Sequence, residues 1–167
     1  MTHRYLIALG SNQWHVRHGD PRRVLAAAFE RLDRKGLKLI AASSVIDSAP
    51  HGPSRRRYAN AVAVISSKLE PDALLGRLHR IEAKFGRRRR GQRWGARVLD
   101  LDLVLWSGGI FAQDQIMVPH PRFRARAFVL GPALAVAADW RDPLTGLTLR
   151  HLHARLTRKA PNPPAKP

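Results

Sequence analysis

Two carboxylates lie one residue apart in an otherwise apolar segment, VLDLDLVLW, at residues 98–106. Side chains alternate across a β-strand, so Asp100 and Asp102 would project from one face, about 6.6 Å apart along the chain. The opposite face would carry four core leucines, Leu99, Leu101, Leu103 and Leu105. Two carboxylates at this spacing can bind Mg²⁺, with water and phosphate oxygens completing its octahedron. The alternative is a polar stripe on a solvated sheet face.

A dense group of arginines precedes the two aspartates: Arg87, Arg88, Arg89, Arg90, Arg93 and Arg97. Guanidinium groups bind phosphate oxygens through paired hydrogen bonds, so a metal and arginines together indicate a polyphosphate ligand. A solvated loop that only adds solubility is the competing interpretation of such a charge run. Trp94 lies in this segment beside Gly95, and its ring could close over a planar ligand or pack against the base of the loop.

A second polar group follows the loop-like segment SAPHGP, residues 48–53. At the start of the next apolar run, Asn60 could present a donor and an acceptor to the edge of a heterocycle, and Tyr58 could line the pocket. Taken alone, both residues fit ordinary strand chemistry. His120, between Pro119 and Pro121, could donate to a phosphate, although a lone surface histidine is more often incidental. The remaining histidines show no paired spacing typical of a zinc site.

Strand and helix patterns alternate along the chain and must position these groups. We expect strands at 5–9, 37–47, 58–66, 98–106 and 116–118, and helices at 21–35, 71–85, 127–138 and 149–156. Asp20 followed by Pro21 is typical of a helix start, and Gly36 and Gly86 of helix ends. This order predicts an α+β fold, a ferredoxin-like, antiparallel-rich sheet packed by helices in αβα layers. Residues 1–158 would form a single domain, with a disordered tail at 159–167.

The composition restricts the class of protein. The chain has 167 residues, enough for one core, and no cysteine, which excludes disulfides and thiolate chemistry and fits a reducing, cytoplasmic setting. Thirty Lys and Arg against 12 Asp and Glu give a formal charge of +18, which favours anionic partners. No apolar run approaches the length of a membrane span, so we expect no membrane partner.

Five ordered motifs carry a resemblance to a known family. They are ALGSN (residues 8–12), SAPHGP followed by YAN (48–60), RWGAR (93–97), LDLDL (99–103) and VPHPRFRARAFVL (118–130). In this order they resemble 6-hydroxymethyl-7,8-dihydropterin pyrophosphokinase, over nearly the whole chain except the tail. The resemblance implies a monomeric ferredoxin-like enzyme of folate biosynthesis. Such an enzyme transfers pyrophosphate from ATP to the hydroxymethyl group of the pterin and releases AMP.

The resemblance also implies roles for individual residues. Asp100 and Asp102 would hold two Mg²⁺ ions and, with Arg87 and Arg97, would form the catalytic set. The expected ATP-binding residues are Glu82, Arg87, Arg89, Trp94, Arg97, His120 and Arg126. The expected pterin-binding residues are Ser48, Ala49, His51, Tyr58, Asn60, Trp94 and Phe128. No general base is assigned, because phosphoryl-type transfer depends mainly on positioning and electrostatic stabilisation.

A small RNA-binding or ribosome-associated α+β domain is the main alternative, since both the charge and the layout permit it. That alternative predicts aromatic side chains exposed on the sheet face. Tyr58, Trp94 and Phe128 instead fall in or beside loops, and two central carboxylates would repel a phosphate backbone in the absence of metal ions. We therefore do not expect a nucleic-acid partner. A two-metal phosphotransferase with another acceptor remains a second alternative, which only the pterin-pocket positions argue against.

Overall fold

The computed structural model describes residues 1–49, 57–86, 98–113 and 115–158. The strands are β1 (His3–Ser11), β2 (Leu37–Ala42), β3 (Ile46–Ser48), β4 (Tyr58–Ser67), β5 (Asp100–Trp106), β6 (Phe111–Gln113) and β7 (Ile116–Val118). The helices are α1 (Pro21–Arg31), α2 (Pro71–Lys84), the short 3₁₀ turn η1 (Phe123–Ala125), α3 (Ala127–Ala137) and α4 (Leu149–Thr157). No helix in the described part of the chain is both long enough and apolar enough to cross a membrane.

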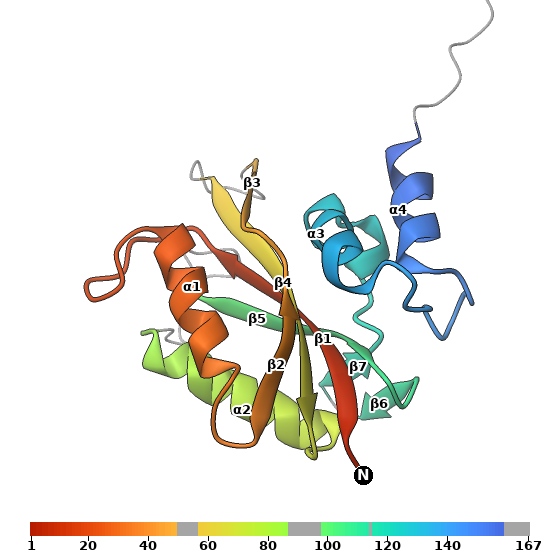
Figure 1. The fold of residues 1–167 in the computed structure, drawn as a ribbon, viewed down its shortest axis with the longest axis horizontal. Helices are drawn as coiled ribbons and strands as arrows, with labels where there is room; N and C mark the ends of the chain where they lie inside the picture. Colours follow the sequence, from red (N-terminus) through yellow and green to blue (C-terminus); the bar gives the residue numbers. More distant parts are fainter. Residues whose placement is uncertain (50–56, 87–97, 114, 159–167) are drawn as a thin grey trace, which may run out of the picture.

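The main sheet has the order β2-β4-β1-β5, and the short β3 also pairs with β4. Every neighbouring pair is antiparallel. The chain order β1-α1-β2-β4-α2-β5, read with this strand order, is the βαββαβ arrangement of the ferredoxin-like fold. The predicted fold class is therefore confirmed. The strand β1 lies at the centre of the sheet, between β4 and β5 (Figure 1).

Helices cover both faces of the sheet, which gives the expected αβα layers (Figure 1). One apolar cluster joins alternate residues of the central strands, such as Ile7 and Ala63, to Leu25 of α1 and Leu78 of α2. A second cluster on the opposite face joins Leu6 and Val62 to residues of α3 and α4, including Leu130 and Leu152. Because strand side chains alternate, each central strand contributes to both clusters.

The first helix begins as its sequence predicts. The Asp20 carboxylate caps α1 by accepting hydrogen bonds from the backbone N–H groups of Arg22 and Arg23, at 2.9 and 3.1 Å. Pro21 occupies the first helical position, where no N–H is needed. The turn after α1 has positive φ angles at Lys35 and Gly36, 55° and 86°, and leads directly into β2.

The predicted single strand at 37–47 is wrong, because the segment forms two strands, β2 and β3. Ser43 interrupts the ladder: its N–H donates to the Val62 carbonyl, while its hydroxyl oxygen accepts from the Val62 N–H, each at 2.9 Å. A side-chain oxygen thus replaces a backbone acceptor at this point. The chain resumes pairing at Ile46, opposite Asn60.

The prediction that Leu105 shares a face with Leu101 and Leu103 is also wrong. The pairing register between β1 and β5 shifts, with Leu6 opposite Leu105 and Ile7 opposite Leu103, so Val104 is an extra residue on β5. This bulge turns Leu105 to the α3 face, where it joins the cluster of Leu6. Upstream of the bulge the predicted alternation holds, and Leu99, Leu101 and Leu103 are all buried in the first cluster.

Two short elements had no counterpart in the prediction. The strand β6 pairs with the predicted β7 as a separate two-stranded sheet, and η1 precedes α3. The predicted tail at 159–167 lies outside the described residues.

A buried ion pair links η1 to the segment between α3 and α4. Asp142 is fully buried and accepts hydrogen bonds from Arg124 Nε and Nη2 at 2.7 and 2.6 Å, and from the Thr145 hydroxyl at 2.6 Å. Burial by itself would raise the pKa of Asp142. The hydrogen bonds from Arg124, Thr145 and the Leu144 N–H outweigh burial and lower this pKa below its ordinary value of 3.8.

We expect Asp142→Asn to lower the free energy of unfolding by about 3 kcal/mol, because it leaves the Arg124 charge half-buried without its partner. The matched control is Asp139→Asn, which breaks the exposed pair with Arg150 and should cost less than about 1 kcal/mol. Urea denaturation measures both changes in the free energy of unfolding.

The effect of Asp142→Asn should also depend on pH. A carboxyl whose pKa is lowered by folding stabilises the fold above its unfolded pKa. The difference from wild type should therefore shrink as the pH falls below 3.8, and a difference constant from pH 7 to pH 3 would contradict this account.

Candidate active site

The pairing of three strands places the two aspartates and Asn60 on one surface. Gly10 of β1 lies opposite Asn60 of β4 on one side and Asp100 of β5 on the other. Two residues earlier on β1, Ala8 lies opposite Asp102. These side chains share the face of the sheet that carries the α3 cluster, since Ala8 belongs to that cluster. The two smallest residue types on β1 therefore separate Asn60 from the carboxylates and leave room above the sheet.

A cavity of about 720 Å³, part of it open to solvent, lies over this part of the sheet. We call it the Tyr58 cavity. Its lining combines apolar and polar side chains from the sheet and from the start of α3: Ala8, Leu9, Gly10, Ser48, Tyr58, Asn60, Asp100, Asp102, Arg126, Phe128 and Val129. Two aromatic rings, one amide and two carboxylates thus meet in a single concave site of the kind that binds small planar ligands.

The Asn60 amide has a defined orientation in this cavity. It is 5% exposed, and its Nδ2 donates to Ser48 Oγ at 2.7 Å and, at 3.5 Å, to the Tyr58 carbonyl. Ser48 ends β3, opposite Tyr58 in the ladder. With the nitrogen engaged by β3, the amide oxygen lies on the Gly10 side, where a Cβ built on Gly10 would come within 3.6 Å of it.

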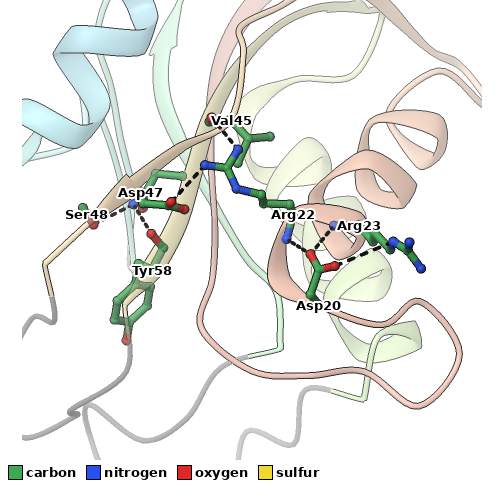
Figure 2. A network of polar contacts seen from close by, with 8 residues as sticks. Asp20, Arg22, Arg23, Val45, Asp47, Ser48 and Tyr58 are labelled. Atoms are coloured by element: carbon green, nitrogen blue, oxygen red, sulfur yellow. Dashed lines mark hydrogen bonds and ion pairs between the residues drawn. The ribbon is translucent and has the colours of Figure 1, made fainter.

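The helix α1 fixes β3 and therefore the outer wall of the cavity. Figure 2 shows Arg22 extending from α1 to β3, where it donates to the Val45 carbonyl at 3.0 Å and to the Asp47 carboxylate at 2.9 Å. The same figure shows Ser48 and Tyr58 beside this contact. The Arg22–Asp47 pair is about half exposed, so its stabilising contribution is small and it mainly orients β3.

A second cavity of about 920 Å³, part of it open to solvent, lies on the other side of the aspartates. We call it the His120 cavity. Its lining comes from α2, β5, β7 and the turn after β7: Leu75, His79, Glu82, Asp100, Leu101, Asp102, Leu103, Gln115, Ile116, Met117, His120 and Pro121. Asp100 and Asp102 line both cavities. A group bound in one cavity would therefore meet a group bound in the other at the two carboxylates.

Two cationic or potentially cationic side chains approach Asp102. Arg126 Nη1 donates to Asp102 Oδ2 at 3.1 Å, and His120 Nε2 lies 3.9 Å from the same oxygen. All three side chains are partly buried, which strengthens the attraction relative to that of an exposed pair. The Arg126 guanidinium also lies 5.7 Å from the centre of the Phe128 ring. Arg126 thus contacts both the carboxylate and the aromatic wall of the Tyr58 cavity.

Burial lowers the pKa of the His120 imidazole below its ordinary value of 6.5, and Asp102 only partly opposes this effect. The ring is therefore neutral at neutral pH. Its Nδ1 accepts a hydrogen bond from the Arg122 N–H at 3.1 Å, so the proton of the neutral ring resides on Nε2. The His120 N–H donates to the Val104 carbonyl at 2.9 Å, which holds this turn against β5. His120 consequently presents an N–H donor toward Asp102 and the His120 cavity.

Glu82 positions the strand that carries both aspartates. This residue is 1% exposed, and its Oε1 accepts a hydrogen bond at 2.8 Å from the N–H of Leu101, which lies between Asp100 and Asp102. This hydrogen bond thus joins α2 to β5, the edge strand of the main sheet, between the two aspartates. This hydrogen bond gives Glu82 a positioning role, and the ATP binding that the resemblance implies for Glu82 stays a prediction.

The structure brings most of the predicted site residues together. The Tyr58 cavity contains Ser48, Tyr58, Asn60, Asp100, Asp102, Arg126 and Phe128, and the His120 cavity contains Glu82 and His120 along with the two aspartates. Ala49 is exposed just after β3 and does not belong to the described lining of either cavity. His51, Arg87, Arg89, Trp94 and Arg97 lie outside the described residues.

Several lining residues had no predicted role, among them Ala8, Gly10 and His79. Ala8 and Gly10 form the floor of the Tyr58 cavity beside the aspartates. The sequence feature that could have identified them is the alternation of small residues along the first strand. His79 lies in the His120 cavity, three residues before Glu82. Helical spacing could have identified His79 as a neighbour of Glu82, since residues three apart share a helix face.

Two carboxylates with a cationic group beside them, on the wall shared by two cavities, are the kinds of group that enzymes use to bind metal ions and phosphate in phosphoryl transfer. Comparison with known proteins defines the family. The family model for 7,8-dihydro-6-hydroxymethylpterin-pyrophosphokinase (HPPK) matches residues 6–138. The chain belongs to this family.

Individual relatives agree with this assignment. The chain is 39% identical over 145 residues to 2-amino-4-hydroxy-6-hydroxymethyldihydropteridine pyrophosphokinase of Pseudomonas aeruginosa. The aligned residues cover 86% of each chain. It is 36% identical over 158 residues to the enzyme of the same name from Methylorubrum extorquens, covering 93% of this chain and 94% of that one. The HPPK-DHPS protein of Plasmodium falciparum superposes with a TM-score of 0.72 at 10% identity, over 93% of this chain and 44% of that one, which supports the fold alone.

The family establishes the reaction. The protein is a pyrophosphokinase that transfers pyrophosphate from its co-substrate ATP to hydroxymethyldihydropterin, a step in folate synthesis. This confirms the prediction from the sequence motifs and favours it over the alternative of an RNA-binding domain.

The contact between Glu82 and Leu101 gives a test of positioning. We expect Glu82→Ala to lower the free energy of unfolding by about 1–3 kcal/mol, because it leaves the buried Leu101 N–H without its acceptor. It should also lower kcat, because β5 would no longer hold the aspartates in place. Glu82→Gln keeps an acceptor oxygen and should restore most of both quantities. Urea denaturation and steady-state kinetics measure the effects. Equal losses of kcat in the two variants would show that the negative charge acts directly on ATP.

Proposed function

We propose that Asp100 and Asp102 hold the Mg²⁺ on which pyrophosphate transfer depends, as two ions between the ATP triphosphate and the pterin. The observation that carries this proposal is the position of both carboxylates on the wall shared by the two cavities. Mg²⁺ binds to proteins through one or two carboxylates and takes its other ligands from water and substrate phosphates. Within the described residues, no three or more His, Cys, Asp or Glu side chains are arranged so that they could hold a metal ion together. Two carboxylates would leave the other coordination positions of Mg²⁺ to water and phosphate oxygens.

We propose that the Tyr58 cavity binds the pterin. Tyr58 and Phe128 supply aromatic faces for a planar heterocycle, and Asn60 supplies an amide that can pair with its edge. Ser48 contributes by holding the Asn60 nitrogen at 2.7 Å. The expected contribution of Ala49 would come through its backbone, since its side chain is not part of the described lining. The depth of this cavity beside the aspartates would bring the hydroxymethyl group of the pterin to the carboxylates.

We propose that ATP binds from the side of the His120 cavity. The Nε2–H of neutral His120 can donate to a phosphate oxygen, and Arg126 can leave Asp102 to bind a phosphate. Four residues of a segment outside the described residues would complete the proposed ATP site: Arg87, Arg89, Trp94 and Arg97. Trp94 would also contribute to the pterin site. His51 is proposed for the pterin site on the same basis.

The chemistry follows from these positions. The pterin hydroxyl oxygen forms a bond to the β-phosphorus of ATP, the bond from that phosphorus to the oxygen of the α-phosphate breaks, and AMP leaves. The hydroxyl proton passes to solvent. Bound Mg²⁺ would neutralise phosphate charge and make the hydroxyl more acidic. The chain itself aligns the two substrates and surrounds the transferred group with hydrogen-bond donors, and such positioning supplies a large part of the acceleration in phosphoryl transfer.

We further propose that residues 1–158 act as one catalytic domain and as a monomer in the cytoplasm. The helix α4 lies beyond the segment matched by the family model, yet Leu149 and Leu152 pack in the same cluster as Leu6 of the central strand. The C-terminal helix therefore shares its core with the sheet. The absence of cysteine is compatible with a reducing compartment. Light scattering after gel filtration should give the mass of one chain, 18.7 kDa.

The metal proposal is tested by Asp102→Asn, assayed with Mg²⁺, ATP and 6-hydroxymethyl-7,8-dihydropterin by chromatography of the adenine product. We expect wild type to form AMP together with pyrophosphorylated pterin. The variant should lose about 10²- to 10³-fold in kcat, because the amide cannot replace the carboxylate as a metal ligand. Asp139→Asn removes an exposed carboxylate elsewhere and should keep full activity. A variant with normal kcat and an unchanged Mg²⁺ dependence would disprove the metal role.

The pterin proposal is tested by Asn60→Ala. We expect KM for the pterin to rise about 10-fold or more, because a heterocycle edge would lose its partner in a buried site. KM for ATP should change little, since the His120 cavity does not include Asn60. Ser48→Ala is the matched variant, which removes only the group that orients the amide, and should give a smaller rise. An equal rise in both KM values for Asn60→Ala would instead indicate general damage to the sheet.

A further inference from the structure

A third cavity lies away from the active site, between the end of α1 and the outer side of α2. Its volume is about 520 Å³, part of it open to solvent. All but one of its lining residues are cationic: Arg31, Arg34, Lys35, Arg77, Arg80 and Lys84, with Ile81 as the exception. We call it the basic cavity. Figure 1 shows α1 and α2 on the same side of the sheet, with α3 on the other.

The helix α2 separates the basic cavity from the His120 cavity. Leu75, His79 and Glu82 line the His120 cavity, whereas Arg77, Arg80 and Lys84 line the basic cavity. At 3.6 residues per turn, these two sets point in directions about 180° apart around the helix axis. A ligand in the basic cavity would therefore not contact the residues of the active site described above.

An unpaired donor indicates that the basic cavity can bind a ligand. The Arg77 Nε atom is buried and has no hydrogen-bond partner within the described part of the chain, whereas Nη2 donates to the Lys35 carbonyl at 3.5 Å. A buried donor without an acceptor is rare in a native structure unless a ligand or water supplies the acceptor.

Helix dipoles explain only part of this charge. Arg31 is the last residue of α1 and Lys84 the last of α2, where cations are favourable. Arg77 lies two turns before the end of α2, beyond the reach of that effect. Acidic neighbours do not balance the cluster: Glu30 lies 4.0 Å from Arg34 in an exposed pair, and Asp33 accepts from the Leu39 N–H. The cations therefore repel one another unless an anion lies among them.

The geometry points to a compact, multiply charged phosphate anion as the ligand, such as inorganic triphosphate or the phosphate chain of a nucleotide. We infer that the basic cavity is a second anion-binding site, separate from the site of pyrophosphate transfer. Guanidinium forks bind phosphate oxygens in pairs, and three arginines and a lysine on two helices can surround a small anion. The described lining includes no aromatic ring on which a base could stack, which favours phosphate over single-stranded nucleic acid.

The test is an NMR titration of the ¹⁵N-labelled full chain with inorganic triphosphate, without Mg²⁺ and at constant ionic strength. We expect saturable shifts of the backbone amides of Lys35 and residues 76–81, with a single dissociation constant. The Arg77→Gln/Arg80→Gln double variant should weaken this binding at least about tenfold. Arg80→Gln/Lys84→Gln changes only exposed side chains, so it tests the site even if loss of Arg77 unfolds the protein.

The matched control is Arg150→Gln/Arg155→Gln on α4, which removes the same charge from exposed positions and should leave the affinity unchanged. An equal loss in this control would mean that only the net charge matters and would overturn the proposal. Shifts confined to amides near Asp102, His120 and Arg126 would overturn it as well. ATP and inorganic triphosphate should bind this site with similar affinity if the phosphate chain alone is recognised. A short single-stranded RNA that bound here more tightly than triphosphate would replace the proposal with a nucleic-acid surface.

Discussion

The site depends on the pairing of β1 with both β4 and β5 in one fixed register. Because Gly10 lies opposite both Asn60 and Asp100, and Ala8 opposite Asp102, the residues of the two cavities occupy defined positions relative to one another. A slip of one residue would turn the carboxylates into the α1–α2 core, where uncompensated charge is very costly. The buried leucines of β5 therefore enforce the register that its aspartates require, and the fold and the site have the same physical origin.

Charge is distributed unevenly over this framework. Asp102 accepts a hydrogen bond from the Arg126 guanidinium and lies near the neutral His120 ring, so Arg126 places one positive charge beside the carboxylates. This cation lowers the electrostatic cost of bringing a phosphate group toward the carboxylates. His120 remains neutral because burial outweighs the attraction of Asp102, and it can donate a hydrogen bond without adding a further charge. The site thus combines two carboxylates with hydrogen-bond donors that suit phosphate.

Sequence patterns predicted the parts of the fold that repeat regularly. The Asp20–Pro21 helix start, the alternation of Leu99, Leu101 and Leu103, and the long strand β4 follow from local chemistry. The break at Ser43 and the bulge at Val104 could not be predicted, because each depends on a partner strand whose register the sequence does not reveal. The two aspartates and Asn60 were predicted for the site by residue type and motif, and the structure brings them to one cavity. The floor at Ala8 and Gly10 was missed, since small residues show their function only when their neighbours across the sheet are known.

The helix α2 illustrates how one element can serve several roles at once. On one side of α2, Leu74 and Leu78 pack in the core. On a second side, Glu82 accepts a hydrogen bond from the strand that carries the aspartates. On a third side, Arg77 and Arg80 line the basic cavity next to α1. Core packing fixes the rotation of the helix, and that rotation then determines where both polar sides point. The backbone positions of the basic residues are therefore fixed in the same way as that of Glu82. Like charges gathered at these positions repel one another, and this is the physical reason for expecting an anion between α1 and α2.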